Sequence, residues 1–277
     1  MDITSPLWVP PTWGQRTAIM GILNVTPDSF SDGGQFAAPS TALAQARNLV
    51  AEGADYIDVG AESTRPGAET ISADEEIARL VPVLEAVVPA IAVPVSVDTY
   101  KSAVARRALE SGAQLVNDIW GFQHDPAMAE VTAEFSAGAI LMHNARGAEP
   151  AGDIISAILR FLEKSIQIAT DGGVDESRII LDPGIGFGMS VAQNLEAIRR
   201  LGELRTLGFP ILLGASRKSV IGKTLDLPVD ERLEGTLATT VAGVQQGVDI
   251  VRVHDVRANL RAARMAEAIY HGPANQT

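Results

Sequence analysis

The sequence predicts a (β/α)8 barrel, an α/β fold in which parallel strands alternate with helices and close into a ring. Two observations carry this prediction. Short runs of apolar and β-branched residues recur along the whole chain, and patterns typical of amphipathic helices lie between them. The length of 277 residues suits one such domain. Periodicity alone leaves a doubly wound open sheet as the alternative architecture.

Each predicted strand is short and mostly apolar, as a buried strand of a parallel sheet should be. The first strand reads "AIMGILNV" and the sixth reads "IILD". The predicted strands span residues 18–25, 56–60, 93–98, 115–119, 139–143, 179–182, 210–214 and 249–254.

Helical patterns fill the intervals, with apolar residues three and four positions apart. The first predicted helix begins at Ser40, a plausible N-cap, and ends before Gly53. The other predicted helices span residues 73–90, 101–111, 126–136, 153–171, 191–206, 230–247 and 256–270. No linker or low-complexity segment divides the chain, so we expect one domain, 1–277, in which residues 1–17 are an N-terminal extension.

Composition excludes several classes of protein. The net charge of −12 and the absence of a basic face argue against nucleic-acid binding. The chain has no cysteine, so any metal must be held by oxygen or nitrogen ligands. No signal-peptide pattern opens the sequence, and the most apolar stretch, 80–97, contains Glu85 and three prolines. We therefore expect a cytoplasmic protein that does not bind membranes.

Polar residues end nearly every predicted strand, where the active site of a (β/α)8 barrel lies. One Asp after a strand is commonly a helix N-cap, and Arg252 or His254 alone could be a surface or satisfied core residue. Asp58 and Asp118 stand one step out of phase with the barrel interior, so we expect them to be structural. Polar groups at so many strand ends together predict a shared polar ligand, because buried polar groups without partners cost free energy.

The types of polar residue indicate the chemistry of that ligand. Carboxylate and amide acceptors suit a flat heterocycle rich in N–H donors, whereas cationic side chains suit phosphate oxygens. An amide oxygen can bind Mg²⁺, which also binds phosphates. The acceptors are Asp98, Asn117 and Asp182; the phosphate ligands are Lys218, Arg252 and His254; the Mg²⁺ ligand is Asn24.

The stretch "DPGIGFGM", residues 182–189, does not match the dinucleotide fingerprint G-x-G-x-x-G. A tight turn that lets the backbone and Phe187 approach a planar ligand fits it better. The stretch "GASRKS" lacks the spacing of a phosphate-binding P-loop.

A series of motifs resembles the dihydropteroate synthase family in order, from about Met20 to the last helix. The motifs are "MGILNVTPDSFSDGG", "DVGAESTRPGA", "VSVDTYK", "NDI", "LMH", "LDPGIGFG", "LLGASRKS" and "VRVHDV". The resemblance implies a TIM barrel that uses Mg²⁺ to join 6-hydroxymethyl-7,8-dihydropterin pyrophosphate to p-aminobenzoate. It also implies a homodimer.

The resemblance implies a role for each candidate residue. The pterin ligands are Asp98, Asn117, Asp182 and Lys218; the Mg²⁺–pyrophosphate ligands are Asn24, Arg252 and His254; the p-aminobenzoate contacts are Phe30, Thr64, Arg65, Pro66 and Ser219. Among these, Asp98, Lys218 and Arg252 are the expected catalytic residues. The polar loop after Asn24 is then a lid with Phe30 inside it, rather than a merely flexible surface loop.

The sequence departs from the family pattern at Met189, where Lys is usual, at Trp120, and in "MHNARGAEP". These departures lie beside the predicted site. The intact "STRPG" run indicates an ordinary sulfonamide-sensitive enzyme. Two other functions stay open: a pterin-binding methyltransferase domain, which needs no pyrophosphate site, and an inactive homologue, which the presence of Asn24, Lys218 and Arg252 argues against.

Overall fold

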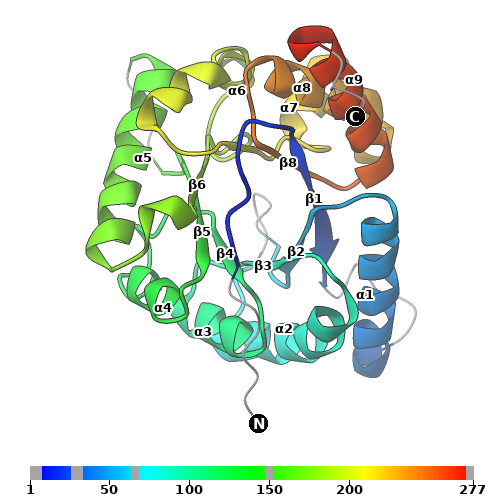
Figure 1. The fold of residues 1–277 in the computed structure, drawn as a ribbon, viewed down its shortest axis with the longest axis vertical. Helices are drawn as coiled ribbons and strands as arrows, with labels where there is room; N and C mark the ends of the chain where they lie inside the picture. Colours follow the sequence, from blue (N-terminus) through cyan, green and yellow to red (C-terminus); the bar gives the residue numbers. More distant parts are fainter. Residues whose placement is uncertain (1–7, 26–33, 64–68, 148–151, 273–277) are drawn as a thin grey trace.

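Parallel strands form a ring with helices around its outside (Figure 1). A computed structural model describes residues 8–25, 34–63, 69–147 and 152–272 of the chain. Within these residues the strands are β1 (Ala18–Asn24), β2 (Tyr56–Gly60), β3 (Val95–Asp98), β4 (Leu115–Asp118), β5 (Gly138–Met142), β6 (Ile179–Asp182), β7 (Leu212–Leu213) and β8 (Ile250–Val253).

The strands follow one another round the sheet in the order β6-β5-β4-β3-β2-β1-β8-β7. A parallel bridge between Leu181 of β6 and Ile211, which precedes β7, joins the two ends of this order. Leu181 also donates its backbone N–H to the Pro210 carbonyl at 2.9 Å. The predicted (β/α)8 barrel is therefore confirmed, and the open sheet is excluded.

The helices lie between successive strands. They are α1 (Gly34–Ala51), α2 (Ala73–Val87), α3 (Ser102–Glu110), α4 (Met128–Glu134), α5 (Ile154–Asp171), α6 (Val191–Arg199), α7 (Ser219–Leu225), α8 (Leu233–Gln245) and α9 (Val256–His271). Short 3-10 helices are η2 (Val88–Ala90), η3 (Glu176–Arg178), η4 (Leu201–Leu207) and η5 (Val229–Glu231). In the part of the chain that the structure describes, none of the helices combines the length and apolarity needed to cross a membrane.

The main differences from the sequence prediction concern α1, α6 and α7. The predicted helix 191–206 is two elements, because α6 ends at Arg199 and the 3-10 helix η4 follows it. α1 begins at Gly34 and continues through Pro39, so Ser40 lies inside the helix and is not its N-cap. Proline removes one backbone hydrogen bond, but the helix continues through Pro39. The prediction lacked α7 altogether, because its seven residues are too few to show a helical period.

Apolar side chains fill the end of the barrel where the strands begin. Trp8 is 3% exposed, and Arg178 donates to its carbonyl at 2.5 Å. A Cβ on Gly138 would lie 2.8 Å from the Trp8 ring, so only glycine fits there. The segment before β1 crosses the barrel opening (Figure 1). With Trp8 it closes a buried cluster of Ala18, Met20, Tyr56, Leu115, Ile140, Ile180, Leu212 and Ile250.

Polar residues occupy the next interior positions, toward the carboxyl ends of the strands. Side chains alternate along a strand, so Asp58 shares the interior face of β2 with Tyr56. The prediction that Asp58 is out of phase was wrong, because the strand register places it inside. Asp118 does face outward and is structural: it accepts the backbone N–H groups of Trp120 at 2.8 Å and Phe122 at 2.9 Å.

Candidate functional site at the carboxyl ends of the strands

A guanidinium group binds two carboxylates inside the barrel. Arg252 donates from Nε to Asp58 Oδ2 at 2.6 Å and from Nη2 to Asp98 Oδ2 at 2.7 Å. Asn117 donates from Nδ2 to Asp58 Oδ2 at 3.0 Å. These residues come from β2, β3, β4 and β8, so the closed ring of strands is what brings them together.

The two carboxylates retain unused acceptor capacity. Asp58 Oδ1 and Asp98 Oδ1 are buried and have no hydrogen-bond partner among the described residues. Burial raises the pKa of Asp98 to about 7, and the nearby Arg252 charge limits that rise. A buried carboxylate oxygen without a donor is unfavourable, so this part of the barrel is suited to a ligand that brings N–H groups.

Asp182 and Lys218 extend the acceptor and donor set. Asp182 accepts the Gly184 N–H through Oδ1 at 2.7 Å, and burial raises its pKa. Lys218 donates to the Ile185 carbonyl at 2.6 Å, and burial lowers its pKa to about 8 against the opposing charge of Asp182. A Cβ on Gly214 would lie 3.5 Å from Asp182 Oδ2 and 3.8 Å from Lys218 Nζ. Both side chains therefore border the small space that Gly214 leaves open.

The stretch 182–189 forms the predicted tight turn. Gly184 has φ +73°, and a Cβ there would lie 1.8 Å from the His143 carbonyl oxygen, so no other residue fits. The turn places Phe187 against Ile119 and Met142 in a small buried cluster. The Phe187 ring centroid lies 4.6 Å from Lys218 Nζ and 4.6 Å from the Arg146 guanidinium carbon. The ring is therefore part of the cationic side of the site.

His254 is oriented by the loop after β7. Ser216 Oγ accepts the His254 backbone N–H at 3.2 Å and lies 3.0 Å from His254 Nδ1. Ser216 can donate its proton to Nδ1, which leaves the imidazole N–H on Nε2. Arg217 binds Asp255 through two hydrogen bonds of 2.9 and 2.6 Å, which fixes the β7 and β8 loops to each other.

The structure brings most predicted site residues to one end of the barrel. Asp98, Asn117 and Arg252 form one connected group, and Phe187 links to Lys218 beside Asp182. Arg252 was predicted at a phosphate end separate from the acceptors, but here it contacts Asp98 directly. The remaining residues include Asn24 at the end of β1, His254 after β8 and Ser219 at the start of α7, whereas Phe30, Thr64, Arg65 and Pro66 lie outside the described residues.

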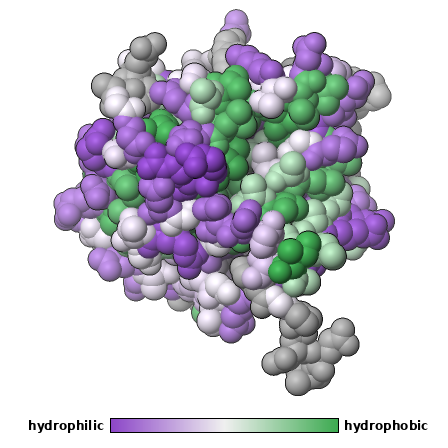
Figure 2. Space-filling model, turned by 90° about the horizontal axis from the view of Figure 1, so that it is seen from above, coloured by the Kyte–Doolittle hydropathy of each residue, from purple (hydrophilic) through white to green (hydrophobic). Residues whose placement is uncertain are grey.

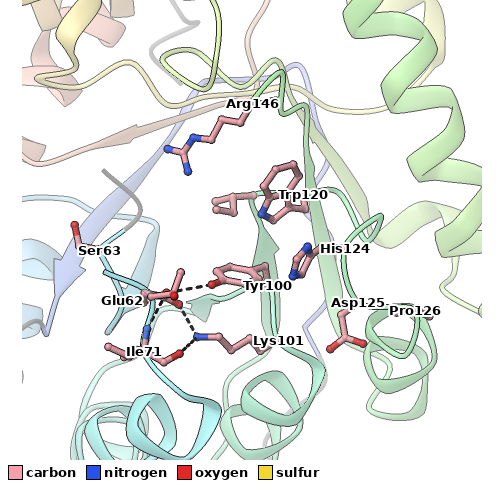
Figure 3. Close-up of a pocket in the computed structure, with 12 residues that line it drawn as sticks. Glu62, Ser63, Ile71, Tyr100, Lys101, Trp120, His124, Asp125, Pro126 and Arg146 are labelled. Atoms are coloured by element: carbon pink, nitrogen blue, oxygen red, sulfur yellow. Dashed lines mark hydrogen bonds and ion pairs between the residues drawn. The ribbon is translucent and has the colours of Figure 1, made fainter. Parts of the chain in front are cut away.

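A pocket of about 610 Å³ lies at the same end of the barrel. Glu62, Ser63 and Ile71 from the β2–α2 connection line one wall, and Trp120 and Arg146 line the other (Figure 3). Ile119 lines both this pocket and the Phe187 cluster, so the pocket adjoins the group described above.

Sequence reasoning missed two groups near this site. The prediction that Asp58 is structural gave it no part in the site, although it binds Arg252. The motifs that contain Glu62 and Lys101 predicted no role for either residue, although the two form an ion pair of 2.6 Å in the pocket wall. Charged residues next to strand ends in "DVGAES" and "DTYK" were the available signal.

Comparisons with known proteins agree with this geometry. The sequence profile described as "Pterin binding enzyme" matches residues 20–254. A curated dihydropteroate synthase of Clostridium beijerinckii is 53% identical over 257 residues, covering 92% of this chain and 95% of that protein. A dihydropteroate synthase from Clostridium difficile, crystallised in the presence of pteroic acid, has a TM-score of 0.91 at 52% identity, covering 94% of this chain and 99% of its own. The Xanthomonas albilineans enzyme with 4-aminobenzoic acid has a TM-score of 0.88 at 39% identity, covering 92% of this chain and 94% of its own.

Proposed function

The chain belongs to the pterin binding enzymes and, within them, to the dihydropteroate synthases, and on that premise we propose how its own residues carry the reaction. A dihydropteroate synthase is a transferase that joins 6-hydroxymethyl-7,8-dihydropterin pyrophosphate to p-aminobenzoate, giving 7,8-dihydropteroate and pyrophosphate. One observation supports the placement of this reaction. Asp98 Oδ1 is buried beside Arg252 and has no hydrogen-bond partner among the described residues.

Asp98, Asn117, Asp182 and Lys218 bind the pterin ring. The ring presents several N–H groups and a carbonyl oxygen in one plane, which matches two carboxylates, an amide and an ammonium group. Asp182 is 4% exposed and the Asp98 side chain 13%, and both lie at strand ends, where the barrel holds them before the ligand arrives. Phe187 lies next to Lys218 and supplies an apolar surface beside the ring.

Arg252 and His254 bind the pyrophosphate. A guanidinium can donate two parallel hydrogen bonds to phosphate oxygens, and the His254 Nε2–H adds a third donor. Arg252 keeps its Nε bond to Asp58 and exchanges Asp98 for the pyrophosphate, since two parallel bonds to phosphate oxygens require its Nη groups. Asp58 thus remains the anion that holds Arg252 in the barrel.

Asn24 would hold Mg²⁺ together with the pyrophosphate. Within the described residues, no group of three or more His, Asp or Glu side chains is placed to hold a metal ion. An amide oxygen beside the pyrophosphate suits Mg²⁺, which keeps several waters and is bound through few protein oxygens plus substrate phosphates. Asn24 lies beside Gly60 in the β1–β2 register, and a Cβ on Gly60 would lie 3.3 Å from Asp98 Cβ. Bound there, Mg²⁺ would neutralise charge on the leaving group.

The reaction is a substitution at the pterin methylene carbon. The carbon–oxygen bond to pyrophosphate breaks, and the leaving oxygen keeps the electron pair, stabilised by Arg252 and His254. The p-aminobenzoate nitrogen forms the new bond to carbon and then loses one proton. Because that amine is neutral near pH 7, the site needs no strong general base. Bond breaking precedes bond making, since the pterin ring can stabilise the methylene cation.

The p-aminobenzoate contacts are Phe30, Thr64, Arg65, Pro66 and Ser219. All but Ser219 lie outside the described residues, so their assignment rests on the sequence motifs alone. The lid predicted from the sequence would exclude water from the methylene cation.

A homodimer through the helices α6 to α9 is also proposed. Figure 2 shows apolar surface gathered over one face of the molecule, on the side where these helices lie in Figure 1. Large apolar side chains exposed on these helices are Leu195, Leu225, Met265 and Ile269. Exposed apolar patches of this kind are typical of protein interfaces.

The function is tested by mixing the protein with both substrates and Mg²⁺ and measuring pyrophosphate release and dihydropteroate. Release of pyrophosphate must require p-aminobenzoate, because the amine is the acceptor. A chain that binds the pterin pyrophosphate without forming dihydropteroate would be an inactive homologue.

A further inference from the structure

A buried ion cluster ties the β2–α2 connection to the end of β3. Lys101, which follows β3, donates from Nζ to Glu62 Oε2 at 2.6 Å, to the Ile71 carbonyl at 2.8 Å and to Glu76 Oε2 at 2.7 Å. An ammonium group has three donors, so the three bonds use all of them. Figure 3 shows Glu62 and Lys101 pointing toward each other in the pocket wall.

The cluster joins the two ends of one connection. Glu62 lies just after β2, and Ile71 lies just before α2. Glu62 Oε1 accepts the Ile71 N–H at 3.3 Å and the Tyr100 hydroxyl at 3.1 Å. The first and last residues of the connection are therefore held by one hydrogen-bonded group, with the Lys101 ammonium at its centre.

The cluster is costly, which argues against a role in stability alone. The Glu76 side chain is completely buried, and its Oε1 has no partner among the described residues. The Glu62 and Lys101 side chains are only 5% and 18% exposed. Replacing a buried ion pair by apolar residues is often neutral or stabilising, so charge is not needed here simply to hold the fold together.

The cluster also lies next to the proposed reaction site. Lys101 is three residues after Asp98 in the chain. The pocket beside Ile119 is lined by Glu62, Ile71, Tyr100 and Lys101. Movement of Glu62 or Ile71 would therefore displace the pocket wall, while Asp98 stays fixed in β3.

We infer that Lys101 is a positioning residue for p-aminobenzoate: its ammonium group holds Glu62 after β2 and Ile71 before α2, and thereby the pocket wall along which the second substrate approaches the pterin. This inference rests on the proposed function, which places p-aminobenzoate on this connection. Lys101 itself does not contact either substrate.

The test compares Lys101→Met, Lys101→Arg and Glu62→Gln with the wild type. We expect Lys101→Met to raise the KM for p-aminobenzoate at least about tenfold and to change the affinity for the pterin pyrophosphate less than about twofold. Lys101→Arg keeps the charge and should restore most of the lost affinity. Glu62→Gln keeps the shape of the side chain and should give an intermediate rise. The matched control is Arg106→Met in α3, which breaks the exposed pair between Arg106 and Glu134 of α4 and should change neither constant.

Thermal melts of each variant separate positioning from misfolding. If Lys101→Met does not fold, Glu62→Gln carries the test. An unchanged KM for p-aminobenzoate in a folded Lys101→Met or Glu62→Gln protein overturns the inference, as does an equal loss of pterin affinity. A wild-type protein that forms no dihydropteroate in the same assay refutes the proposed function instead, so the two failures are distinguishable.

Discussion

Asp98→Asn should make the protein more stable and its pterin binding weaker. Asp98 is a buried carboxylate with one unpartnered oxygen, and burial raises its pKa to about 7. Asparagine keeps the shape and an acceptor for Arg252, but it carries no charge to bury. The variant therefore separates the cost of the buried charge in the free protein from its use with the ligand.

The magnitude follows from the pKa. A carboxyl whose pKa rises from 3.8 to about 7 on folding costs at most about 4 kcal/mol of unfolding free energy when ionised. That value already includes the attraction between Asp98 and Arg252, so the bond is not subtracted a second time. A stabilisation of at most about 4 kcal/mol is therefore expected near pH 8. For the ligand, loss of a hydrogen bond to a charged acceptor predicts roughly 10- to 150-fold weaker pterin binding.

The sign of the pH dependence provides an internal check. The folded protein holds the Asp98 proton between about pH 4 and pH 7, whereas the unfolded chain has lost it, so the unfolding free energy of the wild type falls as the pH rises through this range. Asp98→Asn removes this contribution. Asp118, whose pKa burial also raises to about 7, stays in the variant, so the slope should become shallower without vanishing.

Urea titrations at several pH values and calorimetry with the dihydropterin pyrophosphate measure the two effects. Unchanged pterin affinity in Asp98→Asn would mean that the ring does not bind this carboxylate. A stability loss at high pH as large as that of a core truncation would mean that the charge of Asp98 is needed by the fold.

Three further predictions concern other parts of the molecule. Arg252→Ala should weaken the pterin pyrophosphate more than a dihydropterin without phosphate, and equal losses in calorimetry would make Arg252 purely structural. Asp118→Ala should leave the backbone N–H groups of Trp120 and Phe122 without an acceptor and destabilise the fold by about 1–3 kcal/mol for each. The pterin affinity of the folded variant, measured in the same titrations, should not change. Phe30→Ala should raise the KM for p-aminobenzoate and leave pterin binding nearly unchanged, because the strand ends hold the ring before the lid closes; tight binding of p-aminobenzoate to the free enzyme would contradict this order.

The barrel was predictable from sequence because its strands are short apolar runs buried on both sides. Residues 56–60 and 179–182 were predicted with the boundaries that β2 and β6 have. β7 has only two residues, and the bridge at Ile211 that closes the ring lies outside it, so no local pattern could show closure directly. The predicted start of α1 at Ser40 was wrong, because the helix begins at Gly34 and includes Pro39 despite the low helix propensity of proline.

The candidate site was predictable as a set of residues but not as a set of contacts. Strand-end positions identified Asp98, Asn117 and Asp182, since the register of a closed sheet brings them to one rim. The pairing of Arg252 with Asp58 depends on strands at opposite ends of the chain, and no spacing in the sequence encodes it. The same is true of Lys101, whose three acceptors come from two other segments.

A crystal structure of the protein with the dihydropterin pyrophosphate and Mg²⁺ tests the central claim most directly. The account predicts ring N–H groups about 3 Å from the carboxylates of Asp98 and Asp182, and an Arg252 guanidinium that has left Asp98 for the pyrophosphate while still bound to Asp58. A ring bound elsewhere, such as in the pocket beside Lys101, or an Arg252 that still binds Asp98 with the pyrophosphate in place, would contradict it.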